Sequence, residues 1–593
     1  MKRKRMRMNR VLSLSLILAL MISIVPVRTA FALTNDTQII NVEWENPTEI
    51  VAMEQQEQQF IVSTKTNNGR VNNFYFTFPA DGGVRFHADN EGVFKPEELS
   101  AIDCVTDGEA IIMSANGTTV KLYDKANPWR FEVYNEKKMQ VVSYDANHIS
   151  LGYDETGAMR KVKIVNAVSE DETLFGLGER FNGFVQNGKT VEMWNVDSFS
   201  QLAKSYGDHN VGYKNIPLLH SNEGYSVFHN NTYYGIVDVA ESNVNECSFE
   251  FYGPILDMYI WTDSAEKNIG HYLELTGNTV LVPKWGLSYW AGQSWSMWSR
   301  EGDSLEDISE QVLPRLDRYD ELQTPIKNIY LEGVGDNKKY LDLTENLMER
   351  GVHVFAWMNS TSYIPGEWEA NREYPYVKWF YPDGTAWWDE KDGDHWIDFT
   401  DPAAMNWAYK RFEPFLGKGL YGTMLDFNDR IDVNAYYPYN GGTGDWMHNF
   451  SCYYYHKTVG ETFKNYYGEG GYITFARAAC AGSQKYTAFF GGDQTADFLG
   501  LQESVSALLS GAASGINIWG SDIGGLGMSE GNDPEVYARW LEFGTFSPLM
   551  RTHGQINWRD PWAYDKNGSS EALFQRYYWT RENLVDMIYS ATI

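Results

Sequence analysis

From about residue 285 onward the chain repeats one pattern, a short apolar run followed by a segment of helical length. The runs are LSYWAGQ (287–293), IKNIYLE (326–332), HVFAWM (353–358), LYGTMLD (420–426), YITFAR (472–477), YTAFFGGD (486–493), INIWGSD (516–522) and FSPLMRTH (546–553). Segments of helical length lie between most of them, at 340–351, 402–417, 449–468, 497–514 and 533–544. Short apolar runs that alternate with helices indicate βα units and a parallel sheet. Eight such units predict a (β/α)8 barrel, the TIM-barrel fold.

Ionisable residues stand at the ends of most of these runs. They are Glu332, Asp426, Arg477, Asp493, Asp522 and His553. In a (β/α)8 barrel the carboxyl ends of the strands converge on one face, where catalysis takes place. A turn explains a single aspartate after a strand. Ionisable groups at so many strand ends instead predict a carboxylate-rich site with one arginine and one histidine.

The N-terminal half has a different pattern. From residue 37 to about 275, apolar and polar side chains alternate in short runs separated by Gly, Asn and Asp, as in NNFYFTF and CSFEFYG. This pattern is typical of an antiparallel β-sandwich. We therefore expect a leader at 1–32, a β-sandwich domain at 33–280 and a catalytic barrel at 281–593. A long aromatic stretch at about 360–400 follows the third barrel run, and we expect it to be an insertion that shapes the site.

The first 32 residues have the pattern of a secretory signal peptide, with a basic start, the apolar run VLSLSLILALMISIVPV and Ala30-x-Ala32. We expect export and cleavage after Ala32. A membrane anchor is disfavoured because the apolar run is short and a cleavage site follows it. Cleavage would remove seven basic residues and no acids, so the formal net charge of −30 would become −37. Such an acidic surface argues against nucleic acid and anionic membranes as partners, and it suits a neutral carbohydrate.

The sequence does not support several other catalytic classes. It contains no HExxH motif and no Cys/His cluster, and no GxGxxG stretch stands between a strand and a helix as a nucleotide site requires, so we expect no metal and no cofactor. We also expect no serine nucleophile. The stretch DFNDRID offers oxygens to a calcium ion but lacks the glycine and terminal glutamate of an EF-hand loop. The scattered cysteines leave pairing open, and Cys452 with Cys480 is one conceivable pair. Two carboxylates in an aromatic-rich pocket are the usual apparatus of a glycosidase.

A set of motifs, in this order along the chain, resembles those of glycoside hydrolase family 31. They are FGLGERF (175–181), MWNVDSF (193–199), LTGNTVLVPKWGLSYW (275–290), RAACAGSQKY (477–486), FFGGDQ (489–494), WGSDIGG (519–525) and RWLEFGTFSPLMRTHG (539–554). The resemblance covers nearly all of the chain after residue 32, and it implies a retaining α-glycosidase. Family members continue into C-terminal β-domains. We expect these to be absent here and the sequence to be a C-terminally truncated piece, because it stops at Ile593 after a stretch that resembles the last barrel helix.

The resemblance also implies roles for individual residues. Asp426 occupies the position of the catalytic nucleophile and Asp493 that of the acid/base, so their carboxyl groups should lie about 5–5.5 Å apart. The other matched positions bind substrate: Asp197, Glu332, Arg477, Asp522 and His553 through sugar hydroxyls, and Trp396, Phe490 and Trp519 as aromatic lining of the pocket.

Three regions depart from the pattern of the family's α-glucosidases. The chain has Met424, Phe427 and Asp429 around the nucleophile in place of Trp-x-Asp-Met-Asn-Glu. Glu332 replaces an aspartate, and Phe490 replaces a tryptophan. We expect cleavage of α-linked glucose in oligo- or polysaccharides, with transglycosylation left open. The departures also leave open an α-xylosidase or α-galactosidase-type specificity and a carbohydrate-binding pseudoenzyme. The oligomeric state is not predicted.

Overall fold

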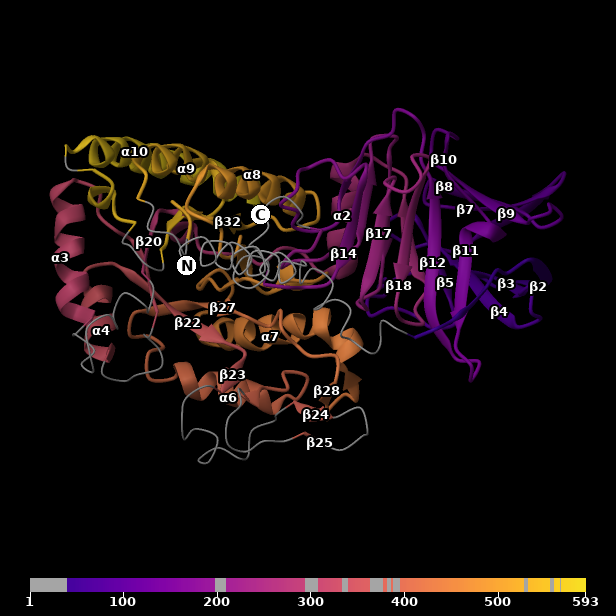
Figure 1. The fold of residues 1–593 in the computed structure, drawn as a ribbon, viewed down its shortest axis with the longest axis horizontal. Coiled ribbons are helices and arrows are strands. Elements are labelled where there is room, and N and C mark those ends of the chain that lie inside the picture. Colours follow the sequence, from indigo (N-terminus) through magenta and orange to yellow (C-terminus); the bar gives the residue numbers. More distant parts are fainter. Residues whose placement is uncertain are drawn as a thin grey trace, which may run out of the picture.

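A computed structural model describes residues 40–197, 210–293, 308–332, 340–362, 377–380, 386–387, 395–526, 532–554, 559–565 and 567–592. The expected signal peptide at 1–32 lies outside these residues, as do parts of the expected insertion at 360–400. None of the helices within the described ranges is both long and apolar enough to cross a bilayer. Figure 1 shows a β-sandwich formed by the first part of the chain beside a helix-covered barrel formed by the second.

Antiparallel sheets form the N-terminal domain. One sheet has the order β1 (Glu43–Glu45), β11 (Ile149–Tyr153), β12 (Met159–Ala167), β18 (Glu246–Phe251), β17 (Gly235–Val239), β14 (Lys189–Met193). A second has the order β13 (Leu174–Gly176), β15 (Leu218–Ser221), β16 (Tyr225–His229), β19 (Asp257–Trp261), β5 (Val84–Ala88), β4 (Val71–Thr77), β3 (Gln59–Lys65), β2 (Glu49–Gln55). A third has the order β10 (Gln140–Asp145), β9 (Arg130–Tyr134), β8 (Thr118–Tyr123), β7 (Ala110–Ala115), β6 (Asp103–Asp107). Alternate residues of β3 are buried, starting with Phe60 and Val62. The predicted antiparallel β-sandwich is confirmed.

Parallel strands form the barrel. Their order is β32 (Trp519–Gly520), β31 (Ala488–Phe490), β30 (Phe475–Ala476), β27 (Leu420–Asp426), β22 (His353–Asn359), β21 (Asn328–Leu331), β20 (Trp290–Gln293), β34 (Arg551–Thr552), β33 (Asp522–Ile523). Each strand overlaps one of the predicted apolar runs. The two outer strands, β32 and β33, are separated in the chain only by Ser521, so the sheet nearly closes on itself. The predicted TIM-like barrel is confirmed.

Helices cover the outside of the barrel (Figure 1). They are α3 (Ile308–Glu321), α4 (Leu341–Glu349), α6 (Ala403–Phe412), α7 (Gly444–Tyr467), α8 (Phe498–Ala512), α9 (Pro534–Phe546) and α10 (Ser569–Thr592). The sandwich domain contains α2 (Ala265–Thr276). The short 3-10 helices are η3 (Ala146–His148), η4 (Lys284–Leu287), η7 (Ser483–Lys485) and η8 (Pro561–Ala563). The sequence patterns predict the barrel helices except α3, which has Pro314 in its interior, and α10, which is expected only from the resemblance. Asp533 caps the start of α9 and Pro534 follows it, so this helix begins where both start signals coincide.

Aromatic side chains fill the barrel interior. Trp290 stacks on Phe355 with 3.9 Å between ring centroids. Tyr330 and Phe475 belong to the same buried cluster. A barrel interior of this kind is a packed core rather than a pore, so chemistry is confined to the strand ends.

The insertion after β22 shares a sheet with the loop after β27. The strands β24 (Lys378–Phe380), β25 (Ala386–Trp387), β28 (Ala435–Tyr437) and β29 (Gly442–Thr443) have the order β25-β24-β28-β29. In this sheet Lys378 pairs with Tyr436, and Trp379 pairs with Ala435. A separate ladder joins β23 (Thr361–Ser362) to β26 (His395–Trp396). The insertion is therefore tied to the chain that follows Asp426.

Loops of the sandwich domain pack against the barrel. Trp194 stacks on His448 of α7, with 3.5 Å between ring centroids and an interplanar angle of 5°. A parallel bridge joins Lys214 to Ala479, just after β30. The sandwich therefore reaches the ends of barrel strands, where the predicted site lies.

Candidate active site

Asp426 is the last residue of β27, and the chain turns sharply after it. Phe427 and Asn428 have φ angles of 57° and 66°, in the left-handed region that favours glycine. The turn lets Phe427 N donate to Asp426 Oδ1 at 2.9 Å. The indole Nε1 of Trp357, on the neighbouring strand β22, donates to Oδ2 at 2.9 Å. Each carboxylate oxygen has a donor, so the side chain of Asp426 is held in one orientation.

Arg477, the residue after β30, lies at the centre of a carboxylate cluster. Its guanidinium donates to Asp429 through Nε at 2.8 Å and through Nη2 at 3.0 Å. Nε also lies 3.3 Å from Asp426 Oδ1, Nη1 lies 3.5 Å from Asp493 Oδ2, and Nη2 lies 3.7 Å from Asp197 Oδ2. Although burial opposes the charge, these carboxylates hold the pKa of Arg477 well above its usual value. The guanidinium of Arg477 therefore lies within 4 Å of the predicted nucleophile, the predicted acid/base and two further carboxylates, those of Asp197 and Asp429.

Asp493 follows β31 through a turn of two glycines. Gly492 has a φ of +84°, and a Cβ at this position would lie 2.2 Å from a ring carbon of Tyr213. Both the backbone conformation and the lack of space therefore require glycine here. The close approach of Tyr213 fixes where the turn, and hence the carboxyl of Asp493, can lie.

The electrostatic surroundings of Asp493 favour its protonated form. Burial is the largest cause, and the attraction of Arg477 opposes it. Repulsion from the carboxylates of Asp197, Asp426 and Asp522 adds to burial, and the pKa of Asp493 rises well above its usual value. A carboxyl with such a pKa retains a proton that it can donate, as a general acid must.

Asp197 comes from the sandwich domain rather than from the barrel. Tyr213 Oη donates to its Oδ1 at 2.9 Å, and the guanidinium of Arg430 donates to Oδ2. Tyr213 is buried, and the guanidinium of Arg477 lies 5.3 Å from its ring centroid. The predicted ligand Asp197 is thus brought to the cluster around Arg477.

Another group of predicted ligands lies around β21, β33 and β34. Tyr330 Oη donates to Glu332 Oε1 at 3.1 Å, and His553 Nε2 lies 3.4 Å from the same oxygen. Asp522 is buried, and its Oδ1 accepts a hydrogen bond from Arg551. Asp522 Oδ2 and His553 Nδ1 are buried without a hydrogen-bond partner among the described residues. Buried polar atoms without a partner are costly, and sugar hydroxyls could satisfy both atoms.

The aromatic residues predicted to line the pocket are more deeply placed. Trp519 is 0% exposed, and its Nε1 donates to Glu179 Oε1 at 2.7 Å. Phe490 is 1% exposed and packs with its ring 5.0 Å from the guanidinium of Arg551. Trp396, in β26 of the insertion, is 9% exposed. Contact of these rings with a sugar stays a prediction, and for Trp519 and Phe490 the burial does not favour it.

Three residues of the site were missed by sequence reasoning: Trp357, Tyr213 and Arg551. Arg551 stands two residues before His553 at the end of a barrel strand, and alternate residues of a strand share a face. The same rule applied to the end of β22 would have drawn attention to Trp357. Tyr213 has no such signal, because its position depends on how a sandwich loop packs on the barrel.

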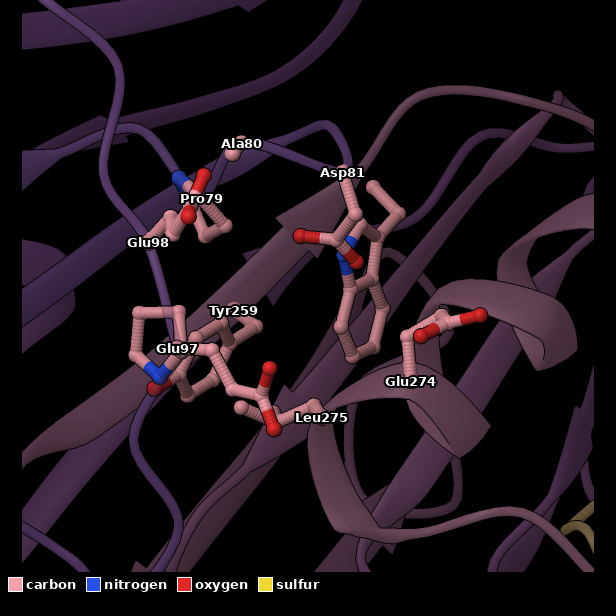
Figure 2. A pocket seen from close by; sticks show the side chains of 10 residues that line it. Pro79, Ala80, Asp81, Glu97, Glu98, Tyr259, Glu274 and Leu275 are labelled. Carbon is pink, nitrogen blue, oxygen red and sulfur yellow. The ribbon is translucent and has the colours of Figure 1, made fainter.

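A separate cavity of about 190 Å³ lies on the sandwich domain, between loops at 79–81 and 96–98, β19 and α2 (Figure 2). The residues that line it include Asp81, Glu97, Glu98 and Glu274, but none of the carboxylates around Arg477.

The described parts of the chain contain no grouping of His, Cys, Asp and Glu arranged to hold a metal ion. The cysteines of these parts, Cys452 and Cys480 included, are free thiols. The catalytic interpretation therefore rests on the cluster around Arg477.

Comparison with family models gives two matches. The model described as the glycosyl hydrolases family 31 TIM-barrel domain matches residues 279–591. The model described as the glycosyl hydrolase 31 N-terminal galactose mutarotase-like domain matches residues 73–238. The first match coincides with the barrel, and the second lies within the sandwich domain.

Curated relatives carry several activities. An alpha-xylosidase of Emericella nidulans is 30% identical over 427 residues, which are 68% of this chain and 52% of the relative. An isomaltosyltransferase of Sporosarcina globispora is 24% identical, with 92% of this chain and 54% of the relative covered. The chain thus spans about half the length of the curated relatives that it matches.

Solved structures share the fold. A cycloalternan-forming enzyme from Listeria monocytogenes, in complex with a pentasaccharide substrate, matches with a TM-score of 0.81 at 20% identity and covers 93% of this chain and 56% of that one. A dextranase from Flavobacterium johnsoniae, complexed with glucose, matches with a TM-score of 0.77 at 20% identity and covers 92% and 70%. At this level of identity the likeness concerns the fold alone.

Proposed function

The chain belongs to glycoside hydrolase family 31, and we propose that it is a secreted retaining α-glycosidase that cleaves α-glucosidic bonds in oligo- or polysaccharides. The observation that carries this proposal is the placement of Asp426 and Asp493 against one guanidinium, at 3.3 Å and 3.5 Å from Arg477. Both oxygens of Asp426 accept hydrogen bonds, whereas the pKa of Asp493 is raised. A nucleophile and a general acid need such different environments.

In the first step, a carboxylate oxygen of Asp426 attacks the anomeric carbon while the bond from that carbon to the glycosidic oxygen breaks. Asp493 gives its proton to this oxygen, so the leaving sugar departs with a neutral hydroxyl group. A glycosyl ester on Asp426 and a carboxylate on Asp493 remain.

In the second step, Asp493 accepts a proton from water as the water oxygen attacks the anomeric carbon and the ester bond to Asp426 breaks. Both side chains then return to their starting protonation states. Two displacements at one carbon give net retention of the α configuration. A sugar hydroxyl in place of water gives transglycosylation by the same step.

The surrounding residues would hold the sugar and balance charge. Arg477 stays cationic while negative charge passes from Asp426 to Asp493, so it stabilises the cluster throughout the cycle. Asp522 Oδ2 and His553 Nδ1 are buried without partners among the described residues, which suits contacts with sugar hydroxyls. Glu332 and Asp197 are the other hydroxyl ligands that we propose.

Specificity for xylose is a second candidate with support of its own. The curated relatives include alpha-xylosidases of Emericella nidulans and Lactiplantibacillus pentosus. The residue after the nucleophile is Phe427, whose ring packs 4.5 Å from the guanidinium of Arg477 and edge-on to Trp357. Xylose lacks the hydroxymethyl group of glucose, so a bulky ring beside the nucleophile would favour it.

A panel of aryl α-glycosides tests the proposal. We expect the wild type to release the phenol from α-glucoside or α-xyloside, and Asp426→Ala to lose this activity. Asp493→Ala should retain more activity on substrates with acidic phenols, which leave without protonation. Absence of turnover by the wild type, with sugar binding retained in calorimetry, would instead indicate a pseudoenzyme. Undiminished turnover by Asp426→Ala would remove it as the nucleophile.

A further inference from the structure

A buried ion pair of the sandwich domain reaches the strand that leads to Asp493. Glu179 and Lys214 stand in two sandwich loops, after β13 and after β14 respectively. Both side chains are 0% exposed, and Lys214 Nζ lies 2.7 Å from Glu179 Oε1. The ammonium also donates to the carbonyl oxygen of Phe490 at 2.8 Å, and Phe490 is the last residue of β31.

The strand end that Lys214 contacts is short. β31 has three residues, and its ladders with β30 and β32 comprise two residue pairs each. Beyond Phe490 the chain continues through two glycines, which have no side chain that could pack and fix the turn. The contact with Lys214 therefore fixes the carbonyl group from which the turn to Asp493 starts.

The residue before Lys214 constrains the same turn from another direction. The ring of Tyr213 fills the space next to Gly492, and its hydroxyl donates to Asp197. One dipeptide of the sandwich domain thus contacts the approach to Asp493 at two points.

Burial works against both charges of the pair. It raises the pKa of Glu179 and lowers the pKa of Lys214. Buried ion pairs often add no net stability compared with apolar residues of the same volume. Trp519 Nε1, from β32, donates to the same oxygen of Glu179. The pair therefore contacts both β31 and β32. These contacts explain the presence of a buried ion pair here better than a gain in stability does.

We propose that Lys214, held in place by Glu179, is a positioning residue for the acid/base Asp493, so that the sandwich domain sets the efficiency of proton transfer to the leaving group. This inference rests on the proposed function. Lys214 acts through the backbone of Phe490 and not on the reacting atoms. A displaced acid/base slows the departure of leaving groups that need a proton, while groups that depart without one are spared.

The test compares a phenyl α-glycoside with the α-glycosyl fluoride of the same sugar, glucose or xylose, whichever the wild type accepts. The variant combines Lys214→Met with Glu179→Gln, which removes both charges of the pair together and keeps an acceptor for Trp519. We expect kcat/KM for the phenyl glycoside to fall about 10-fold or more, and kcat/KM for the fluoride to change by less than about 2-fold. Azide, a nucleophile that needs no base, should raise kcat of the variant and not that of the wild type.

Lys161→Met is the matched control. Lys161 is a mostly buried lysine of the same domain, and its Nζ lies 3.8 Å from Glu250 in a neighbouring strand. We expect this variant to treat both substrates like the wild type. Glu179→Gln alone keeps both hydrogen bonds of Lys214, and we expect a smaller loss with the same preference for the fluoride.

The outcomes separate the inference from the function on which it rests. Thermal melting first establishes that each variant is folded at the assay temperature. Equal losses on the two substrates in the folded variants, or no loss at all, would overturn the positioning role and leave the proposed function intact. If the wild type released neither phenol nor fluoride from either sugar, the proposed function would fall, and the inference with it.

Discussion

The raised pKa of Asp493 can be tested by removing one of its negative neighbours. Asp197→Asn is suitable because the amide oxygen can still accept the hydrogen bond from Tyr213. The carboxylates of Asp197 and Asp493 contact two nitrogens of Arg477, at 3.7 Å and 3.5 Å. At a separation of about 7 Å and an effective dielectric constant of about 20, their repulsion is about 2 kcal/mol.

The direction of the effect follows from the role of Asp493. A general acid works only when protonated, and negative neighbours favour the protonated form, so they keep its pKa high. Removing the charge of Asp197 lowers this pKa, and Asp493 then loses its proton at a lower pH. We therefore expect the alkaline limb of the kcat/KM profile to move to lower pH by about 1 unit or more.

The assay is kcat/KM for an aryl α-glycoside from about pH 4 to about pH 10, measured for wild type, Asp197→Asn and Asp432→Asn. Asp432 is an exposed carboxylate in the loop after β27 and serves as the control. Its replacement should leave the alkaline limb in place. If the limb stayed fixed in Asp197→Asn, or moved to higher pH, repulsion between the two carboxylates could not be what raises the pKa.

Other variants test the remaining contacts of the site. Asp429→Ala leaves the buried charge of Arg477 without its bidentate partner, so the free energy of unfolding should fall by about 3–5 kcal/mol in chemical denaturation. Trp357→Phe removes a hydrogen bond to the carboxylate of Asp426, so kcat/KM should fall roughly 10- to 100-fold while the melting temperature stays close to that of the wild type. Gly492→Ala forces the turn before the acid/base to move, so activity should fall about 100-fold while far-UV circular dichroism is retained.

The strand-end carboxylates could be predicted because their signal is local. Asp426 ends an apolar run, and in a barrel the end of a strand determines which face a side chain reaches. The two left-handed residues that follow were not predictable in the same way. Asn428 is of a type that tolerates this conformation, but Phe427 is not, and only the packing around its ring makes the conformation tenable. Pro314 likewise lowers the helix propensity of α3, so a prediction from propensity alone misses this helix.

Contacts that depend on how the two domains pack could not be predicted from sequence patterns. Nothing near Tyr213 or Lys214 in the chain indicates that a sandwich loop meets the end of β31. The prediction for Trp519 shows the complementary limit. Trp519 lies in β32, next to β31, but whether its indole faces the pocket or Glu179 is decided by neighbours from another domain.

The sheet shared by the insertion and the loop after β27 bears on how specificity could be transplanted between relatives. β28 begins nine residues after Asp426 and takes its register from β24 of the insertion. A chimera that exchanged 360–400 alone would leave β28 facing a foreign partner, and the strain would fall on the turn beside the nucleophile. An active chimera should therefore take residues 360–400 and 427–443 together from one donor protein.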